Sequence, residues 1–142
     1  MGGTPPEDRG AARRTRGPVR RFEDLEVWQE SRVLAREVYR LARETPLGRD
    51  FKLRDQMCDA AVSVMSNIAE GFERDGDREF PHFLSIAKAS CGEVRSQNYV
   101  ALDIGHFSDE EFAALRSRCE RISRMIAALR TAVLRRRSDP PR

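Results

Sequence analysis

Apolar residues recur at helical spacing in four separate segments of this 142-residue chain, and this repetition constrains the fold more than any other feature. Within each segment they return every three or four positions, which places them on one face of an α-helix. Helix-breaking or capping residues bound the segments, for example Pro46 with Gly48, and Ser108 with Glu111 in a capping box. The predicted helices cover about residues 24–44, 51–70, 77–104 and 108–136.

The connections between these segments are short, and short connections force consecutive helices to lie antiparallel. The sequence therefore predicts an all-α fold, an antiparallel up-down-up-down four-helix bundle over residues 22–137. Residues 1–21 are rich in Arg, Gly and Pro, and residues 138–142 are polar. Neither segment can bury enough apolar surface to fold, so we expect a disordered basic N-terminal arm and a disordered C-terminal tail.

Charge is distributed unevenly along the chain. The net charge of +3 combines +4 in residues 1–21, −8 in residues 22–115 and +7 in residues 116–142. Basic ends on an acidic body favour contact with polyanions. Because the chain has only two lysines, Lys52 and Lys88, the Arg excess also fits a bias in genome composition.

Composition also limits where the protein acts. No apolar run reaches the ~20 residues that a membrane span needs, and the N-terminus lacks the apolar core of a signal peptide. We therefore expect a cytoplasmic protein without a membrane partner. Three cysteines lie far apart in the sequence, and in a reducing compartment they are expected to be buried thiols: Cys58, Cys91 and Cys119.

Candidate catalytic residues are few. The two histidines belong to acid-x-x-His pairs of the kind that bind metals in bundle cores, Glu79 with His82 and Asp103 with His106. Both pairs fall on the third predicted helix, about 36 Å apart, so they cannot share a site. No nucleophile elbow or phosphate-binding loop is present. We therefore expect no enzymatic activity, no metal and no other cofactor.

The stretch from Ser66 to Ser90 is the densest in polar residues, and we interpret its centre as a structural joint between the second and third helices. Gly71 is expected to end the second helix with a positive φ, and Asp77 to cap the third. Asn67 is expected to hydrogen-bond the loop backbone or the open amides near Asp77. Glu70 is expected to contact an arginine or the first turn of the third helix. A ligand or subunit contact is the alternative.

The first predicted helix has a wider apolar face than one core contact requires. Val27, Leu34, Val38 and Leu41 form one stripe, and a second stripe beside it includes Leu25, Trp28 and Tyr39. The surplus predicts an oligomer interface formed by Leu25, Trp28 and Tyr39. A wide but wholly intramolecular face explains the pattern equally well.

The same central stretch resembles a known family, the four-helix bundle proteins encoded in intervening sequences of bacterial large-subunit ribosomal RNA genes. The matching motifs are S-N-I-A-E-G-F, then E-F, then F-L-x-I-A-K-x-S followed by an acidic residue, with Leu-x-x-Trp near the start. They occupy Ser66–Phe72, Glu79–Phe80, Phe83–Ser90, Glu93 and Leu25–Trp28. The resemblance covers about residues 22–135; Pro81 and Cys91 stand where the family usually has other residues.

The resemblance implies an antiparallel bundle that assembles into homopentamers and has no assigned enzymatic activity. A more distant similarity links the family to the accessory protein of diversity-generating retroelements, a pentameric barrel that binds its reverse transcriptase and RNA. RNA and a reverse transcriptase are thus plausible partners by analogy alone.

The charge pattern leads to two functional hypotheses. Four arginines of the last helix fall opposite its apolar face and are predicted to point outward: Arg116, Arg121, Arg124 and Arg135. A homo-oligomer would repeat this basic face, and we expect it to bind structured RNA. A solvated face with Glu partners is the alternative for the arginines themselves. The second functional hypothesis is a protein–protein adaptor ring that docks a nucleic-acid enzyme such as a reverse transcriptase, through an exposed patch at Trp28 and Tyr39.

Overall fold

The structure, a computed structural model, describes residues 19–74 and 78–138, and all regular structure within these ranges is helical. Two short 3-10 turns, η1 (Phe22–Asp24) and η2 (Pro46–Arg49), precede the first and second long helices. The four long helices are α2 (Glu26–Glu44), α3 (Phe51–Glu73), α4 (Phe80–Asp103) and α5 (Asp109–Ser138). Most of the predicted N-terminal arm and C-terminal tail lies outside the described residues.

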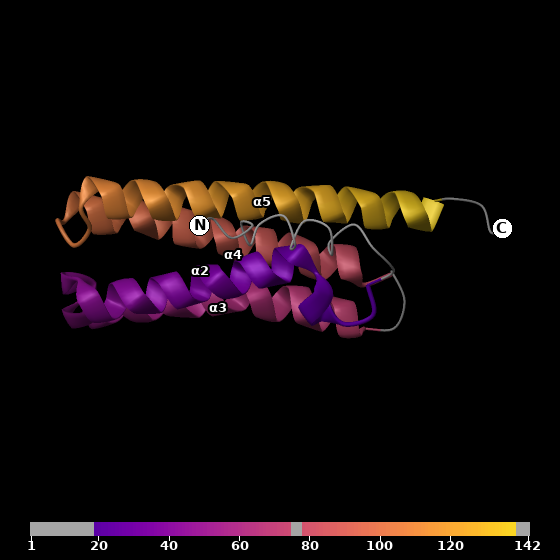
Figure 1. The fold of residues 1–142 in the computed structure, drawn as a ribbon, viewed down its shortest axis with the longest axis horizontal. Coiled ribbons are helices and arrows are strands. Elements are labelled where there is room, and N and C mark those ends of the chain that lie inside the picture. Colours follow the sequence, from indigo (N-terminus) through magenta and orange to yellow (C-terminus); the bar gives the residue numbers. More distant parts are fainter. Residues whose placement is uncertain (1–18, 75–77, 139–142) are drawn as a thin grey trace, which may run out of the picture.

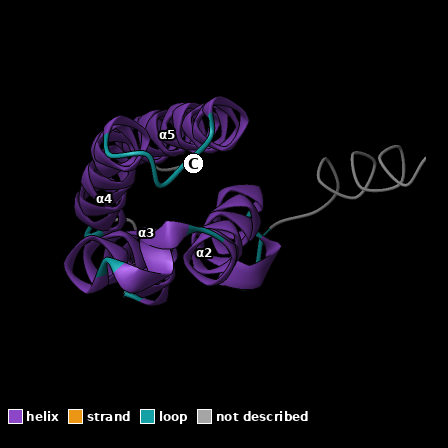
Figure 2. Ribbon diagram, turned by 90° about the vertical axis from the view of Figure 1, so that its left-hand side faces the viewer, coloured by secondary structure: helices purple, strands orange, loops and turns teal. Residues whose placement is uncertain are grey.

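The long helices run up and down in alternation, and this confirms the predicted antiparallel four-helix bundle (Figure 1). Viewed along the bundle, α4 lies between α3 and α5, while α2 packs against α3 (Figure 2). The contact between α2 and α5 closes the bundle and is the least extensive of the four. Both α4 and α5 therefore keep broad outer surfaces.

The core is built from the predicted apolar stripes. Each helix contributes side chains with no exposed surface, such as Leu34, Ile68, Leu84 and Ile126. All three cysteines are buried and free, as predicted. Burial of these stripes stabilises the fold by roughly 1.5–3 kcal/mol per large side chain before the entropy cost of folding is counted. Two polar side chains, Ser31 and Asn98, have no exposed surface. Asn98 donates from Nδ2 to the Phe112 carbonyl at 3.0 Å, which links α4 to the first turn of α5.

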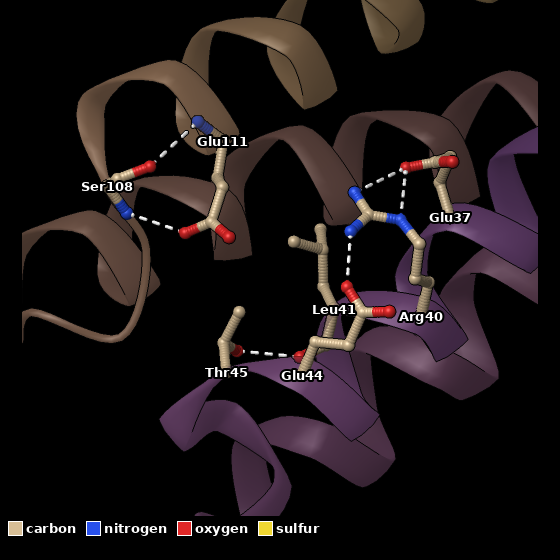
Figure 3. Close-up of polar contacts among 7 residues, drawn as sticks. All are labelled: Glu37, Arg40, Leu41, Glu44, Thr45, Ser108 and Glu111. Carbon is tan, nitrogen blue, oxygen red and sulfur yellow. Dashed lines mark hydrogen bonds and ion pairs between the residues drawn. The ribbon is translucent and has the colours of Figure 1, made fainter.

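Local sequence signals set several helix ends. The predicted capping box at the start of α5 is present: Ser108 Oγ accepts from the Glu111 amide at 3.1 Å, and the Glu111 carboxylate accepts from the Ser108 amide at 2.8 Å (Figure 3). Asp50 caps α3 by accepting from the Leu53 amide at 3.3 Å. Gly105, with φ of 82°, ends α4 in the left-handed conformation that glycine adopts without strain.

The prediction for Gly71 was wrong. Among the described residues Gly105 is the one with a positive φ, and α3 continues past Gly71 to Glu73. Gly71 is instead buried at the crossing of α3 with α4, where an added Cβ would lie 2.6 Å from Phe83 Cβ and 2.9 Å from Phe80 Cδ1. Glycine is required here for close helix approach and not for a turn.

The polar side chains of the predicted joint also differ from expectation. Asn67 donates to the carbonyl and hydroxyl oxygens of Ser63, at 2.8 and 2.9 Å, and not to the loop backbone. The Ser63 hydroxyl lies 2.9 Å from that of Ser90, so this chain of hydrogen bonds ties α3 to α4. Asn67 bonds Ser63 and not the loop because Ser63 lies one helical turn away on the same face.

The remaining two joint residues lie near the turn. Glu70 accepts from Arg74 at 2.8 Å, which agrees with the expected arginine partner; Arg74 directly follows the end of α3. Asp77 lies outside the described residues. The position before α4 is held by Glu79, so the helix begins at Phe80 and not at the predicted residue 77.

Part of the predicted oligomer interface is buried within the protomer itself. Leu25 is only 8% exposed and belongs to the hydrophobic core, which corrects its assignment to a subunit contact. Trp28 packs against the same core and meets Phe22 edge-on, with ring centroids 5.1 Å apart. Tyr39, 46% exposed, is the most exposed of the three, and Trp28 is half-buried.

Candidate nucleic-acid interface

The outer face of α5 carries the four arginines that helical phase predicted to point outward. Arg116, Arg121, Arg124 and Arg135 are all exposed, while Leu115, Ile122, Ile126 and Val133 on the opposite face are buried. At about 1.5 Å per residue the arginines extend over about 28 Å of helix. Several phosphates of one nucleic-acid strand fit along this length.

Two of the four arginines have carboxylate partners. Arg116 donates to Glu120 at 2.8 Å within α5, and this hydrogen bond holds the pKa of Glu120 below its usual range. Arg121 lies 3.3 Å from Glu30 of α2 and helps to hold α2 against α5. Within the described ranges, Arg124 and Arg135 have no ion pair. These two positive charges are therefore the ones most available to an external anion.

Some arginines outside α5 are neutralised by nearby carboxylates. Arg40 of α2 is held between two carboxylates, at 2.9 Å from Glu37 and 2.7 Å from Glu44 (Figure 3). Arg54 of α3 lies 3.0 Å from Asp55, and Arg74, which follows α3, lies 2.8 Å from Glu70. Among the four long helices α5 has the largest net positive charge, with eight arginines against four carboxylates.

The opposite side of the bundle is acidic. A groove of about 540 Å³ between α3 and α4 is lined by two carboxylates, Asp59 and Glu93, and by neutral side chains, with no cation among its lining residues. Two amide side chains also line it, Gln56 and Gln97. An anionic ligand would be repelled from this side and attracted to α5.

A second groove, of about 570 Å³, lies between α4 and α5 and was missed in the sequence. It is lined by two cations, Lys88 and Arg130, together with small and hydroxyl side chains. Lys88 stands out in the sequence as the only lysine on its helix. Helical phase alone, however, does not show that it faces a groove. No sequence feature marks Arg130 as a groove residue, because its position depends on how α5 packs against α4.

The residues considered for catalysis lie far apart in the described structure. His82 stands in the first turn of α4, edge-on to Phe83, with ring centroids 5.6 Å apart. His106 follows the other end of the helix and lies 3.0 Å from Asp50, so it joins the α4–α5 connection to the start of α3. That hydrogen bond, with the cap bond from Leu53, lowers the pKa of Asp50. Across residues 19–74 and 78–138, no three His, Cys, Asp or Glu side chains are grouped as a metal site requires.

No helix in the described part of the chain is long and apolar enough to cross a membrane. The fold and its charge distribution define an antiparallel four-helix bundle with one basic side. Residues 23–128 match the family described as 23S rRNA-intervening sequence protein. The match spans well over half of the chain, and the protein therefore belongs to this family.

A solved structure supports the fold. The chain is similar to a protein of unknown function from the S23 ribosomal protein family of Bacteroides thetaiotaomicron, with a TM-score of 0.66 and 17% sequence identity. The similarity covers 72% of this chain and 96% of the other. At this identity the comparison establishes the shared fold and nothing more. Comparison with curated proteins finds no significant match.

Proposed function

We propose that this protein is a non-catalytic, homo-oligomeric bundle that binds structured RNA in the cytoplasm through the basic outer face of α5. The observation that carries the proposal is the pair Arg124 and Arg135, both exposed and without an ion pair in the described structure. Eleven residues separate them, which puts both on the same face of the helix about 17 Å apart. Arg116 and Arg121 extend this face toward the start of α5.

The physical basis of binding is electrostatic. Each arginine that neutralises a phosphate releases a condensed counterion, so affinity falls as salt rises. Base-specific contacts are not required, and the face offers no aromatic platform interleaved with the arginines on which unpaired bases could stack. Recognition of a folded RNA by its backbone fits this surface better than recognition of a single-stranded sequence.

Assembly into a homo-oligomer would multiply a weak contact. Exposed apolar side chains on α4 and at its C-terminal end support such an assembly: Ile86, Val100 and Ile104 recur on one face and are 36–53% exposed. This face lies on the acidic side of the bundle, beside Glu93, so burying it between subunits would leave α5 open to RNA. Five subunits is the number that the family resemblance implies.

The RNA-binding proposal is tested with the double variant Arg124→Glu/Arg135→Glu and a fluorescein-labelled RNA hairpin, followed by fluorescence anisotropy. We expect Kd to rise about tenfold or more, and the slope of log K against log salt to fall by about two. The matched control is Arg32→Glu/Arg43→Glu, because these exposed α2 arginines have the same eleven-residue spacing and their substitution changes the charge equally. Equal loss in both variants, or no binding by the wild type, would contradict the proposal.

The adaptor ring remains a second candidate because Tyr39 is exposed. Trp28, which would form the other half of the docking patch, is partly buried against the hydrophobic core. A reverse transcriptase or another nucleic-acid enzyme would then dock on α2 and not on α5. Binding of such an enzyme that is lost in Tyr39→Ala and kept in Arg124→Glu/Arg135→Glu would favour this candidate.

A further inference from the structure

The two grooves that flank α4 have opposite chemistry. The groove between α3 and α4 contains carboxylates and no cation, whereas the groove between α4 and α5 contains cations and no carboxylate. Both are open and similar in volume, about 540 and 570 Å³. The difference in charge therefore decides which kind of ligand each can accept.

Small side chains make the α4–α5 groove hollow. Ala89 and Gly92 on α4 face Ala127 on α5, and none of them fills the space between the helices. A Cβ added at Gly92 would meet no atom within 4 Å. A ligand can therefore approach the helix backbone closely along this line.

The cation at the inner edge of the groove is held in place by the fold. Arg130 donates from Nε to the Pro81 carbonyl at 3.2 Å, and Ser85 Oγ donates to the same oxygen at 3.1 Å. This arrangement fixes the guanidinium of Arg130 in the groove and uses one of its five N–H groups. No other bond of that guanidinium is formed within the described ranges, so four N–H groups are left for an external acceptor.

Lys88 and Thr131 complete the groove. Lys88 is exposed and has neither a hydrogen bond nor an ion pair to the described residues. Thr131 lies seven residues after Arg124 and four before Arg135, which places its hydroxyl on the same face as these arginines. It also lines the hollow beside Arg135. The groove is therefore continuous with the basic face of α5.

We propose that the groove between α4 and α5 binds the phosphodiester backbone of the RNA, with Lys88 and Arg130 neutralising phosphate oxygens and Thr131 donating a hydroxyl hydrogen bond. Two cations, hydroxyl donors and the absence of a lining carboxylate match the chemistry of a phosphate ligand. This inference rests on the proposed function, and it adds a shaped site to what is otherwise an open basic face.

Two variants distinguish RNA binding in a shaped groove from non-specific electrostatic attraction of RNA to the basic surface. Lys88→Glu reverses a charge in the groove, and Gly92→Leu places a bulky side chain in it without changing the charge. With the RNA hairpin probe, we expect Lys88→Glu to raise Kd about tenfold and to lower the salt slope by about one. Gly92→Leu is expected to raise Kd several-fold. Circular dichroism should show intact helices, because leucine favours helix more than glycine does.

The matched control is Lys52→Glu, which makes the same change at the other lysine, exposed in the first turn of α3. Its Kd is expected to stay within about twofold of the wild-type value, since it lies outside the groove. The groove proposal would be overturned if Lys52→Glu and Lys88→Glu weakened RNA binding equally, or if Gly92→Leu bound RNA like the wild type. If both groove variants bind like the wild type while Arg124→Glu/Arg135→Glu does not, the groove is refuted and the proposed function stands. If the wild type fails to bind, the proposed function itself fails.

Discussion

Replacing Gly71 by alanine tests the packing of α3 against α4 most directly. The new Cβ would lie 2.6 Å from Phe83 Cβ and 2.9 Å from Phe80 Cδ1, well inside the 3.5–4.0 Å or so at which carbon atoms attract each other. The Phe83 Cβ is fixed to the backbone of α4, so rotation of a side chain cannot relieve the closest contact. The helices must separate locally by about 1 Å, and overpacking of this kind costs about 1–3 kcal/mol.

Helix propensity offsets part of that cost. Alanine is favoured over glycine inside a helix by about 0.5–1 kcal/mol, so the net destabilisation by Gly71→Ala is centred on about 1 kcal/mol. Gly92→Ala supplies the matched control, because it also lies inside a helix but its Cβ would meet nothing within 4 Å. It is expected to stabilise the protein by about 0.5–1 kcal/mol.

Urea unfolding followed by circular dichroism measures both effects. The two variants and the wild type are compared at one protein concentration, because self-association makes apparent stability depend on concentration. The free energies of unfolding of the two variants should differ by about 2 kcal/mol, with opposite signs relative to the wild type. If Gly71→Ala were as stabilising as Gly92→Ala, the close approach of α3 to α4 at Gly71 would be wrong.

Two further predictions concern polar contacts between helices. Hydrogen bonds from His106 and the Leu53 amide lower the pKa of Asp50, so its contribution to stability is present above its ordinary pKa of about 4 and is lost as the pH falls through the lower folded value. Asp50→Ala should therefore be destabilised relative to wild type at neutral pH, and the difference in urea unfolding should shrink in acid; a difference independent of pH would refute this. Asn67→Ala removes both hydrogen bonds to Ser63 and should cost about 1 kcal/mol. Ser66→Ala, at an exposed neighbouring position, should be nearly neutral in the same urea experiment. An equal loss in both variants would contradict a specific contribution of the hydrogen bonds between Asn67 and Ser63.

Features that depend on a single helix were predictable from the sequence. The apolar period locates all four helices, and the Ser108–Glu111 capping box forms from residues three positions apart. The outward direction of the α5 arginines follows from the same period, because the opposite face is apolar. Each of these predictions needs only local geometry, which the chain carries in its spacing.

Features that depend on the contact between helices were not predictable in this way. A glycine near a helix end signals a turn as strongly as it signals close packing, and only the Phe80–Phe83 surface decides between them at Gly71. Arg121 forms an ion pair with Glu30, ninety-one residues away in the sequence. Arg130 donates a hydrogen bond to the Pro81 carbonyl, forty-nine residues away. The α4–α5 groove arises from the same long-range packing, so its cations were missed.

A native mass spectrum of the protein, purified without nuclease and recorded before and after ribonuclease treatment, tests the central claim most directly. RNA binding by an oligomeric bundle predicts a multiple of the chain mass that carries additional mass, and ribonuclease should remove that addition. The Arg124→Glu/Arg135→Glu variant should show the same oligomer without it. A bare wild-type oligomer that also fails to bind the RNA hairpin would contradict RNA binding and direct the search to a protein partner at Tyr39.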